Sequence, residues 1–263
     1  MTARPRTRRR ADYLDMQAAV GVTKHMGGFE ATRELLRLCQ VQEAHEVLDV
    51  GCGIGVGPAY VAKTFGCRVV GVDLSERMID WARRRARQER VEAFVELRVA
   101  DVLALPFPDD RFDVVVCESV LTFVEDKTQA IRECVRVTKP GGYLGLNEGV
   151  WLREPPAEMI ERVKGAIGPS VPTEDAWRSL WAASGLRDRV VRIKQVDPGT
   201  EIKSRIRWIG WPWILRAWGR AVRLYLRDPT IRLSIKQQFD VPRDVFRFAG
   251  YGLFVGKKAE PSS

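Results

Sequence analysis

The chain has 263 residues, of which 45% are apolar and 29% charged, as expected for a globular protein with one sizeable core. The formal charge of +9 is uneven: residues 1–10 contribute +5, residues 11–202 contribute −5, and residues 203–263 contribute +9. This distribution favours an anionic neighbour for the C-terminal part, with an ordinary solvated basic surface as the alternative.

The cysteines and the first residues indicate the compartment. Residues 1–10 are basic like the start of a signal peptide, but residues 11–20 supply no continuous apolar stretch. We therefore expect a disordered basic N-terminus at 1–10 and no secretion. Without a CxxC pair, the thiols are expected to be reduced in a cytoplasmic protein, and no metal site is predicted. The five cysteines are Cys39, Cys52, Cys67, Cys117 and Cys134.

From residue 46 onward, apolar β-branched runs alternate with helix-forming segments. An amphipathic helix at 31–41 precedes them, so residues 11–45 are expected to form a helical cover. Alternation of this kind predicts an α/β fold, with a parallel sheet and helices on both faces. The expected strands are 46–51, 67–74, 94–101, 112–119 and 141–149, and the helices between them are 58–66, 75–89 and 127–139.

Beyond residue 150 the pattern changes. Helices are expected at 155–167 and 173–185, a sixth strand at 187–196 and a seventh at 245–258. The segment between the last two strands is helical in character. The predicted organisation is therefore a core of 46–196 and 241–258, a helical insertion at 197–240, and a tail at 259–263.

The stretch LDVGCGIGVG offers a ligand-binding turn. Gly51, Gly53 and Gly55 leave the first strand and open a helix, where backbone N–H groups can approach a ligand. A dinucleotide fingerprint would need glycine or alanine at 56, where this chain has Val56. Asp49 stands two residues before Gly51, so the turn favours a positively charged ligand over a pyrophosphate.

VLDVGCGIG resembles the first motif of the class I S-adenosylmethionine-dependent methyltransferases. The other motifs follow in the family's order: GVDLS with Asp73, VADVLALPF with Asp101, then FDVVVCES and KPGGYLGLNE. The resemblance covers about residues 25–150 and includes the ubiquinone, menaquinone and sterol methyltransferases. It implies a Rossmann-like sheet of order 3-2-1-4-5-7-6, with strand seven antiparallel and a helical insertion between strands six and seven.

The resemblance also implies S-adenosylmethionine as the cofactor, and each position has a plainer alternative. Asp73 would hold the ribose hydroxyls, although it could cap a helix, a role that suits Ser75 better. Asp101 could merely cap a turn, and Met78 could be core. The implied cofactor-binding set is Asp49, Gly51, Cys52, Gly53, Gly55, Asp73, Leu74, Met78, Asp101, Val102 and Glu118.

Three residues are candidate proton acceptors for an acceptor that needs one. His25 lies in TKHMGGFE, which resembles the H-x-G segment of small-molecule methyltransferases, and histidine suits proton transfer near neutral pH. The alternative is an exposed loop histidine. Glu118 ends the fourth strand and could face cofactor or acceptor. For Glu148, after the fifth strand, a structural hydrogen bond or a substrate contact is preferred over catalysis.

The segment RWIGWPWILRAWGRAVRLYLRD, residues 207–228, predicts an amphipathic helix of about 15 residues that starts at Trp213 and stops at Asp228-Pro229. A bilayer span is excluded, since four arginines would cost about 2.5–3.5 kcal/mol each near its centre. The segment is expected to be a lid whose apolar face covers the acceptor. The expected lid residues are Trp208, Trp211, Trp213, Trp218 and Tyr225.

Peripheral contact of this helix with an anionic membrane, at its inner face, remains open, as does packing against the body or a second subunit. Nucleic acid is disfavoured because the arginines and tryptophans tend to opposite faces. The predicted function is methyl transfer to a hydrophobic small molecule of isoprenoid, quinone-like, polyketide or lipid type. RNA or protein methylation and a non-catalytic cofactor-binding regulator are the alternatives, and monomer and homodimer are both open.

Overall fold

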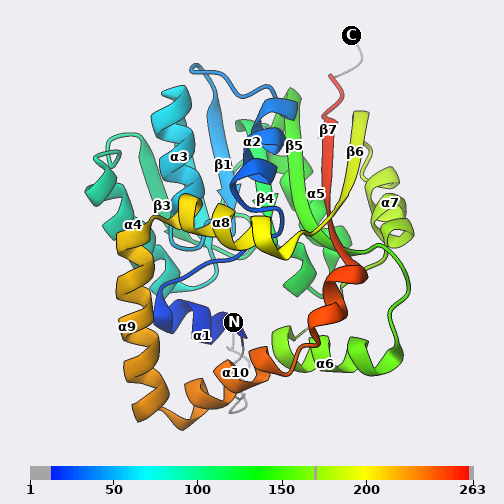
Figure 1. Cartoon of the computed structure of the whole chain (residues 1–263). Helices are drawn as coiled ribbons and strands as arrows, with labels where there is room; N and C mark the ends of the chain where they lie inside the picture. Colours follow the sequence, from blue (N-terminus) through cyan, green and yellow to red (C-terminus); the bar gives the residue numbers. More distant parts are fainter. Residues whose placement is uncertain (1–12, 169–170, 261–263) are drawn as a thin grey trace, which may run out of the picture.

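The computed structural model describes residues 13–168 and 171–260, and a seven-stranded sheet forms its centre (Figure 1). The strand order β3-β2-β1-β4-β5-β7-β6 confirms the expected order. β7 pairs antiparallel with β5 and β6, whereas the other neighbours pair in parallel. The strands are β1 Glu46–Val50, β2 Arg68–Asp73, β3 Val95–Val99, β4 Phe112–Glu118, β5 Thr138–Trp151, β6 Arg187–Gln195 and β7 Ala249–Lys257.

Successive residues of the central strands enter two different cores. Val47 of β1 packs with α2, α3 and α4 on one face, and Leu48 packs with α5 and α7 on the other. Strands buried on both faces read as continuous apolar runs, which is why the sequence located them well. These helices are α2 Gly28–Leu38, α3 Val56–Phe65, α4 Glu76–Glu89, α5 Lys127–Val137 and α7 Glu174–Ala182.

The remaining helices form a cap, defined here as α1, α6, α8, α9 and α10. Figure 1 shows α1, α6, α9 and α10 beyond the carboxyl ends of the parallel strands, with α8 running across the sheet to reach α9. α1 contacts α6, α9 and α10, so the cap joins the N-terminal segment to the insertion before β7. The cap helices are α1 Tyr13–Val20, α6 Ala157–Ile167, α8 Pro198–Ile209, α9 Trp211–Arg227 and α10 Pro229–Phe239.

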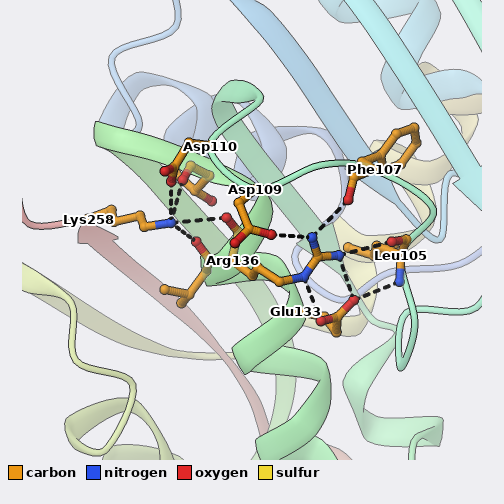
Figure 2. A network of polar contacts seen from close by, with 9 residues as sticks. Leu105, Phe107, Asp109, Asp110, Glu133, Arg136 and Lys258 are labelled. Atoms are coloured by element: carbon orange, nitrogen blue, oxygen red, sulfur yellow. Dashed lines mark hydrogen bonds and ion pairs between the residues drawn. The ribbon is translucent and has the colours of Figure 1, made fainter.

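A polar network braces the loop between β3 and β4 (Figure 2). The guanidinium of Arg136 donates to the carbonyls of Leu105 and Phe107 and to the carboxylates of Asp109 and Glu133, at 2.8–3.0 Å. The hydrogen bonds to Glu133 and Asp109 raise the pKa of Arg136 above its usual value, and the bond to Arg136 lowers the pKa of Glu133. The loop that follows Asp101 is therefore tied to α5.

Several details refine the predictions. α5 ends at Val137 rather than at residue 139, because β5 begins at Thr138. All five cysteines are buried and free, as expected for reduced thiols. The predicted disordered segment 1–10 lies outside the described residues. Within the described ranges, no helix is both long enough and apolar enough to span a bilayer.

Candidate functional site

The glycine turn after β1 depends on three residues in the left-handed backbone conformation. Gly51, Gly53 and Gly55 have φ values of 73°, 53° and 78°, a region that side chains rarely tolerate. A Cβ on Gly55 would lie 2.8 Å from Cα of Ala82, so glycine is also needed for α3 to pack against α4. The backbone N–H groups of Gly51 and Cys52 donate to the carbonyl of Val72, which fixes the turn to β2.

Two acidic side chains meet at this turn. Asp73 accepts hydrogen bonds from the backbone N–H of Gly53 at 3.0 Å and of Ser75 at 2.9 Å. Asp49 accepts no hydrogen bond from the described residues. Its Oδ2 lies close to the backbone of Gly57, where an added Cβ would come within 2.3 Å of it. Burial raises the pKa of both carboxyls, and the charge of Glu118 raises that of Asp49 further. Asp49 is buried and Asp73 partly buried, and no cation among the described residues pairs with either carboxylate, which favours a cationic ligand that also carries hydroxyl donors.

The other predicted cofactor residues lie around the same edge in different environments. Leu74 is 68% exposed, whereas Met78 is buried in an apolar cluster with Ile54 and Val56. Asp101 is exposed and accepts from the backbone N–H of Leu103 at 2.9 Å, so it caps a turn. Val102 is buried in the main core, so only its backbone is free to meet a ligand. Their contact with the cofactor stays a prediction.

A polar cluster gathers His25, Thr32, Glu118 and Asn147 at the carboxyl edge of β4 and β5. The hydroxyl of Thr32 lies 2.9 Å from both carboxylate oxygens of Glu118 and 3.1 Å from Nε2 of His25. Nε2 of His25 is 3.9 Å from Glu118, and Nδ2 of Asn147 donates to Glu118 at 2.9 Å. The structure thus brings together two predicted residues, His25 and Glu118, with two that the sequence did not single out.

The hydrogen bonds assign the tautomer of His25. Thr32 has one hydroxyl proton, which it donates to the carboxylate of Glu118. In the neutral imidazole, Nε2 of His25 then donates its own proton to the Thr32 oxygen, and Nδ1 carries the lone pair. The imidazole is nearly buried and stands edge-on to Trp208, with ring centroids 5.7 Å apart. A buried imidazole with a free lone pair can accept a proton.

Asn147 is the polar residue that sequence reasoning missed. It is fully buried, and its Nδ2 also donates to the carbonyl of Met26 at 3.0 Å, while its Oδ1 has no partner among the described residues. The strand register places it directly beside Glu118. Its position one residue before Glu148 on the ligand-binding edge was the available signal.

Glu148 points away from this cluster and has a structural role. Its side chain is fully buried and accepts from the backbone N–H groups of Val120, Leu121 and Thr122 and from the Thr122 hydroxyl, at 2.8–3.1 Å. Burial raises the pKa of Glu148, although these four donors oppose the shift. With its oxygens committed to the loop after β4, Glu148 is not retained as a candidate base.

Arg85 links the glycine turn to the cap and was also missed. It is 5% exposed and donates to the carbonyl of Ile54 at 3.2 Å and to that of Ile209, at the end of α8, at 3.1 Å. Its guanidinium also pairs with Glu89 and stacks on Trp213. One arginine among three consecutive arginines on α4 gives no sequence signal of burial.

α8 clamps the segment that carries His25. Glu201 accepts a hydrogen bond from the backbone N–H of Gly27, and Ser204 accepts one from that of Phe29 at 2.7 Å. The N-cap residue of α2, Gly27, has no side chain to do this itself. The free N–H groups at the start of α2 are therefore satisfied by the cap, a contact between residues more than 170 positions apart.

The lid tryptophans divide between two environments. Trp208 and Trp213 are buried, and Trp208 packs with Phe29 and Tyr60 beside His25. The prediction that Trp211 and Trp218 face the acceptor is wrong in this structure, because they are 56% and 71% exposed. The inward side of α9 is instead set by Trp213 and its neighbours, which pack on α1 and α4.

The remaining lid prediction concerns Tyr225, which is half-buried and carries the guanidinium of Arg232 over its ring at 5.6 Å. α9 itself begins two residues earlier than expected and ends at Arg227, where Asp228 caps α10. Tyr225 thus braces α9 against α10, and its contact with an acceptor stays a prediction.

Two surface hollows lie beside these features. A hollow of about 240 Å³ is lined by Phe29, Val56, Tyr60 and Trp208 together with charged residues at its rim. Another of about 380 Å³ is polar and lies at the opposite edge of the sheet, around Asp113 and Lys139. The second is remote from the glycine turn, so the chemistry of the side chains locates the site better than the size of the hollow.

Comparison with known proteins agrees with this geometry. A family model described as a methyltransferase domain matches residues 48–146. Ajmaline N-methyltransferase of Rauvolfia serpentina is 32% identical over 212 residues, 72% of this chain and 72% of that protein. Phosphoethanolamine N-methyltransferase 1 of Arabidopsis thaliana is 37% identical over 180 residues, 68% of this chain. This chain spans only about a third of the latter, since the match covers 36% of its length.

A solved structure shares the fold. Geranyl diphosphate methyltransferase in complex with S-adenosylmethionine superposes with a TM-score of 0.64 at 19% identity, covering 88% of this chain and 85% of that one. The chain therefore belongs to the class I S-adenosylmethionine-dependent methyltransferases. The residues at the turn fit this cofactor in two respects. Asp49 and Asp73 supply two carboxylates with no cation paired to them among the described residues, and Gly51, Gly53 and Gly55 leave three positions of the turn without side chains, although their backbone N–H groups are bonded within the protein.

Proposed function

We propose that this methyltransferase acts on a hydrophobic small-molecule acceptor of isoprenoid, quinone-like, polyketide or lipid type. The observation that carries the proposal is the aromatic wall beside His25: Trp208 stands 5.7 Å from the imidazole, and Phe29 and Tyr60 pack on Trp208. A binding site that is mostly apolar, with a few placed polar groups, is typical for such ligands. Here the polar groups are those around Glu118.

Each group has a part in the proposed reaction. Asp73 would hold the ribose hydroxyls of the cofactor, and Asp49 would face its positive charge. When bound, S-adenosylmethionine supplies an activated methyl group, so the protein has mainly to position the acceptor and exclude water. His25 accepts the acceptor's proton at Nδ1, while Thr32 and Glu118 hold the ring and stabilise the imidazolium that forms.

The relatives support a small acceptor over a macromolecule. Both named relatives carry names of small-molecule N-methyltransferases, and the superposed structure is named for geranyl diphosphate. The contact of Glu201 and Ser204 with the His25 segment further supports a closed site, because it holds the cap over the edge where an RNA or protein chain would have to enter.

The proposal is tested by binding and then by turnover. Calorimetry with S-adenosylmethionine and with NAD should give binding of the former alone. Radiolabelled methyl transfer is then measured with prenyl quinols, geranyl diphosphate, a polyketide, phosphoethanolamine and RNA. Turnover of an apolar acceptor is the expected result. Transfer confined to phosphoethanolamine or RNA would overturn the acceptor class, and cofactor binding without any transfer would favour the regulator.

His25→Gln tests the proposed base. Glutamine can keep the contact with Thr32 but cannot accept a proton, so turnover of an acceptor that ionises should fall by about 10²–10⁴-fold. Cofactor affinity should be unchanged. His45→Gln is the matched control, since this second histidine lies at the opposite edge of the sheet. Equal turnover in both variants would remove His25 from the reaction.

A further inference from the structure

The solvent-facing side of α9 carries an apolar stripe that the methyl-transfer site does not use. Its five members are 54–71% exposed and recur every three or four residues. On a helix with 3.6 residues per turn, they fall within about 80 degrees of one another. We name this set the outer stripe: Trp211, Leu215, Trp218, Val222 and Leu226.

The outer stripe is not needed to hold α9 in place. The opposite side of the helix makes the contacts: Trp213 donates from Nε1 to the carbonyl of Gly21 at 2.8 Å, and Arg220 donates to that of Val20 at 2.7 Å. Scattered exposed apolar residues are ordinary, but a continuous stripe with two tryptophans marks an interaction surface. In Figure 1, α9 lies at the outer edge of the cap, where such a surface is accessible.

A fringe of arginines runs beside the outer stripe. Arg216, Arg223 and Arg227 are exposed and start about 60 degrees from the stripe on the helix surface. Within residues 13–168 and 171–260, no carboxylate pairs with any of the three. Arg84 of α4 and Arg220 of α9 both stack on Trp81, with Cζ 4.8 and 4.4 Å from the ring centroid, which adds positive charge to the same side.

This charge is not neutralised by the protein. Nη2 of Arg220 is buried with no partner among the described residues, and the pKa of Arg220 is lowered by burial and by the charges of Arg84 and Arg216. Like charges that gather without acidic partners are stabilised by an external anion.

We propose that the outer stripe and its arginine fringe dock α9 on an anionic lipid surface. The tryptophans would enter the boundary between headgroups and acyl chains, and the arginines would meet lipid phosphates. A second copy of the chain fits less well, because a two-fold interface along α9 would bring two arginine fringes together. The proposal does not depend on the methyl acceptor, so it can fail or succeed on its own.

Vesicle flotation tests the proposal with the full chain. The probes are vesicles of phosphatidylcholine alone and of equimolar phosphatidylcholine and phosphatidylglycerol, at low and high salt. We expect binding to the anionic vesicles, weakened by salt. Trp218→Asp/Leu226→Asp and Arg216→Glu/Arg223→Glu/Arg227→Glu should each lower the partition coefficient at least about tenfold.

Matched controls separate docking from general effects. Arg37→Glu/Arg68→Glu/Arg187→Glu changes the net charge equally at exposed positions on the opposite edge of the sheet, and Phe94→Asp places an acid on an exposed apolar residue before β3, away from the cap. Thermal melting and cofactor calorimetry show that each variant is folded. The controls should keep full binding.

Three results would overturn the proposal. The first would be a wild-type chain that fails to float with anionic vesicles, and the second would be stripe variants that float as well as the wild type. The third would be control variants that lose as much binding as the tested ones. Sedimentation of the same samples covers the second-copy alternative. A wild-type dimer that the stripe variants convert to a monomer, with no change in flotation, would assign the outer stripe to self-association instead.

Discussion

The glycine turn and the cap are held together by different kinds of contact. The turn is built from neighbouring residues, in which backbone N–H groups of Gly51 and Cys52 reach β2 and Gly53 donates to Asp73. The cap is built from contacts between segments far apart in sequence, such as Trp213 with Gly21 and Arg85 with Ile209. A cofactor site that depends on local sequence sits beneath an acceptor cover that depends on tertiary packing.

The largest expected effect compares two tryptophans on the same cap helix. Trp213→Ala removes a buried ring, its hydrogen bond to Gly21 and its stack on Arg85, and should cost about 3–5 kcal/mol of unfolding free energy. Trp218→Ala, on the outer stripe, should stay within about 0.5 kcal/mol. Urea denaturation measures both. Equal losses would mean that α9 packs with its other side inward.

The next effect concerns the turn. Asp73→Asn keeps the shape but replaces a charged acceptor, so affinity for S-adenosylmethionine should fall roughly 100-fold. Calorimetry measures it, with Asp80→Asn on the exposed side of α4 as the control. If Asp73→Asn binds like the wild type, the carboxylate does not hold the ribose.

A smaller effect tests the clamp between the two regions. Glu201→Ala/Ser204→Ala removes both side chains of α8 that accept hydrogen bonds from the start of α2 and should cost about 1–2 kcal/mol of unfolding free energy. Turnover should fall more than cofactor affinity, because His25 loses its position while Asp73 keeps its own. Glu174→Ala, exposed on α7, is the control. A parallel loss of cofactor affinity would show that the clamp serves the turn as well.

The smallest effect is a pH dependence. The pKa of Asp73 is raised above its ordinary 3.8, mainly by burial, so its carboxylate protonates at a higher pH than usual. As pH falls toward that pKa, cofactor affinity should drop because the ribose acceptor is lost, whereas the free protein should gain stability as the buried charge is removed. Asp49 titrates in the same direction. The variant Asp49→Asn/Asp73→Asn should therefore give the flat reference in calorimetry across this range.

Sequence reasoning predicted the turn more closely than the cap. Gly55 and Asp73 lie where the motifs put them, because positive φ and a strand-end carboxylate are local requirements. Asn147 was missed, since its position before Glu148 at the ligand-binding edge was the one available signal and nothing local identifies its amide as a partner of Glu118. Glu148 holds the loop after β4, because that loop folds back over it and donates backbone hydrogen bonds to its carboxylate.

α9 shows where periodicity stops being sufficient. A helical wheel separates arginines from apolar residues, but it cannot decide which of two apolar sides faces the protein. That choice followed from Trp213 meeting Arg85 and Trp81, and from carbonyls at the end of α1 that needed donors. The exposure of Trp211 and Trp218 is a consequence of that packing.

The sequence by itself determined the strands and the glycine turn, because each rests on periodicity or backbone conformation within a few residues, and the motif resemblance implied the order of the sheet and the cofactor class. The tertiary structure decided which histidine nitrogen is free, how α8 fixes the start of α2, and which side of α9 meets solvent. These depend on partners as far as 200 residues apart, as between Arg220 and Val20, and such partners are chosen only when distant helices pack.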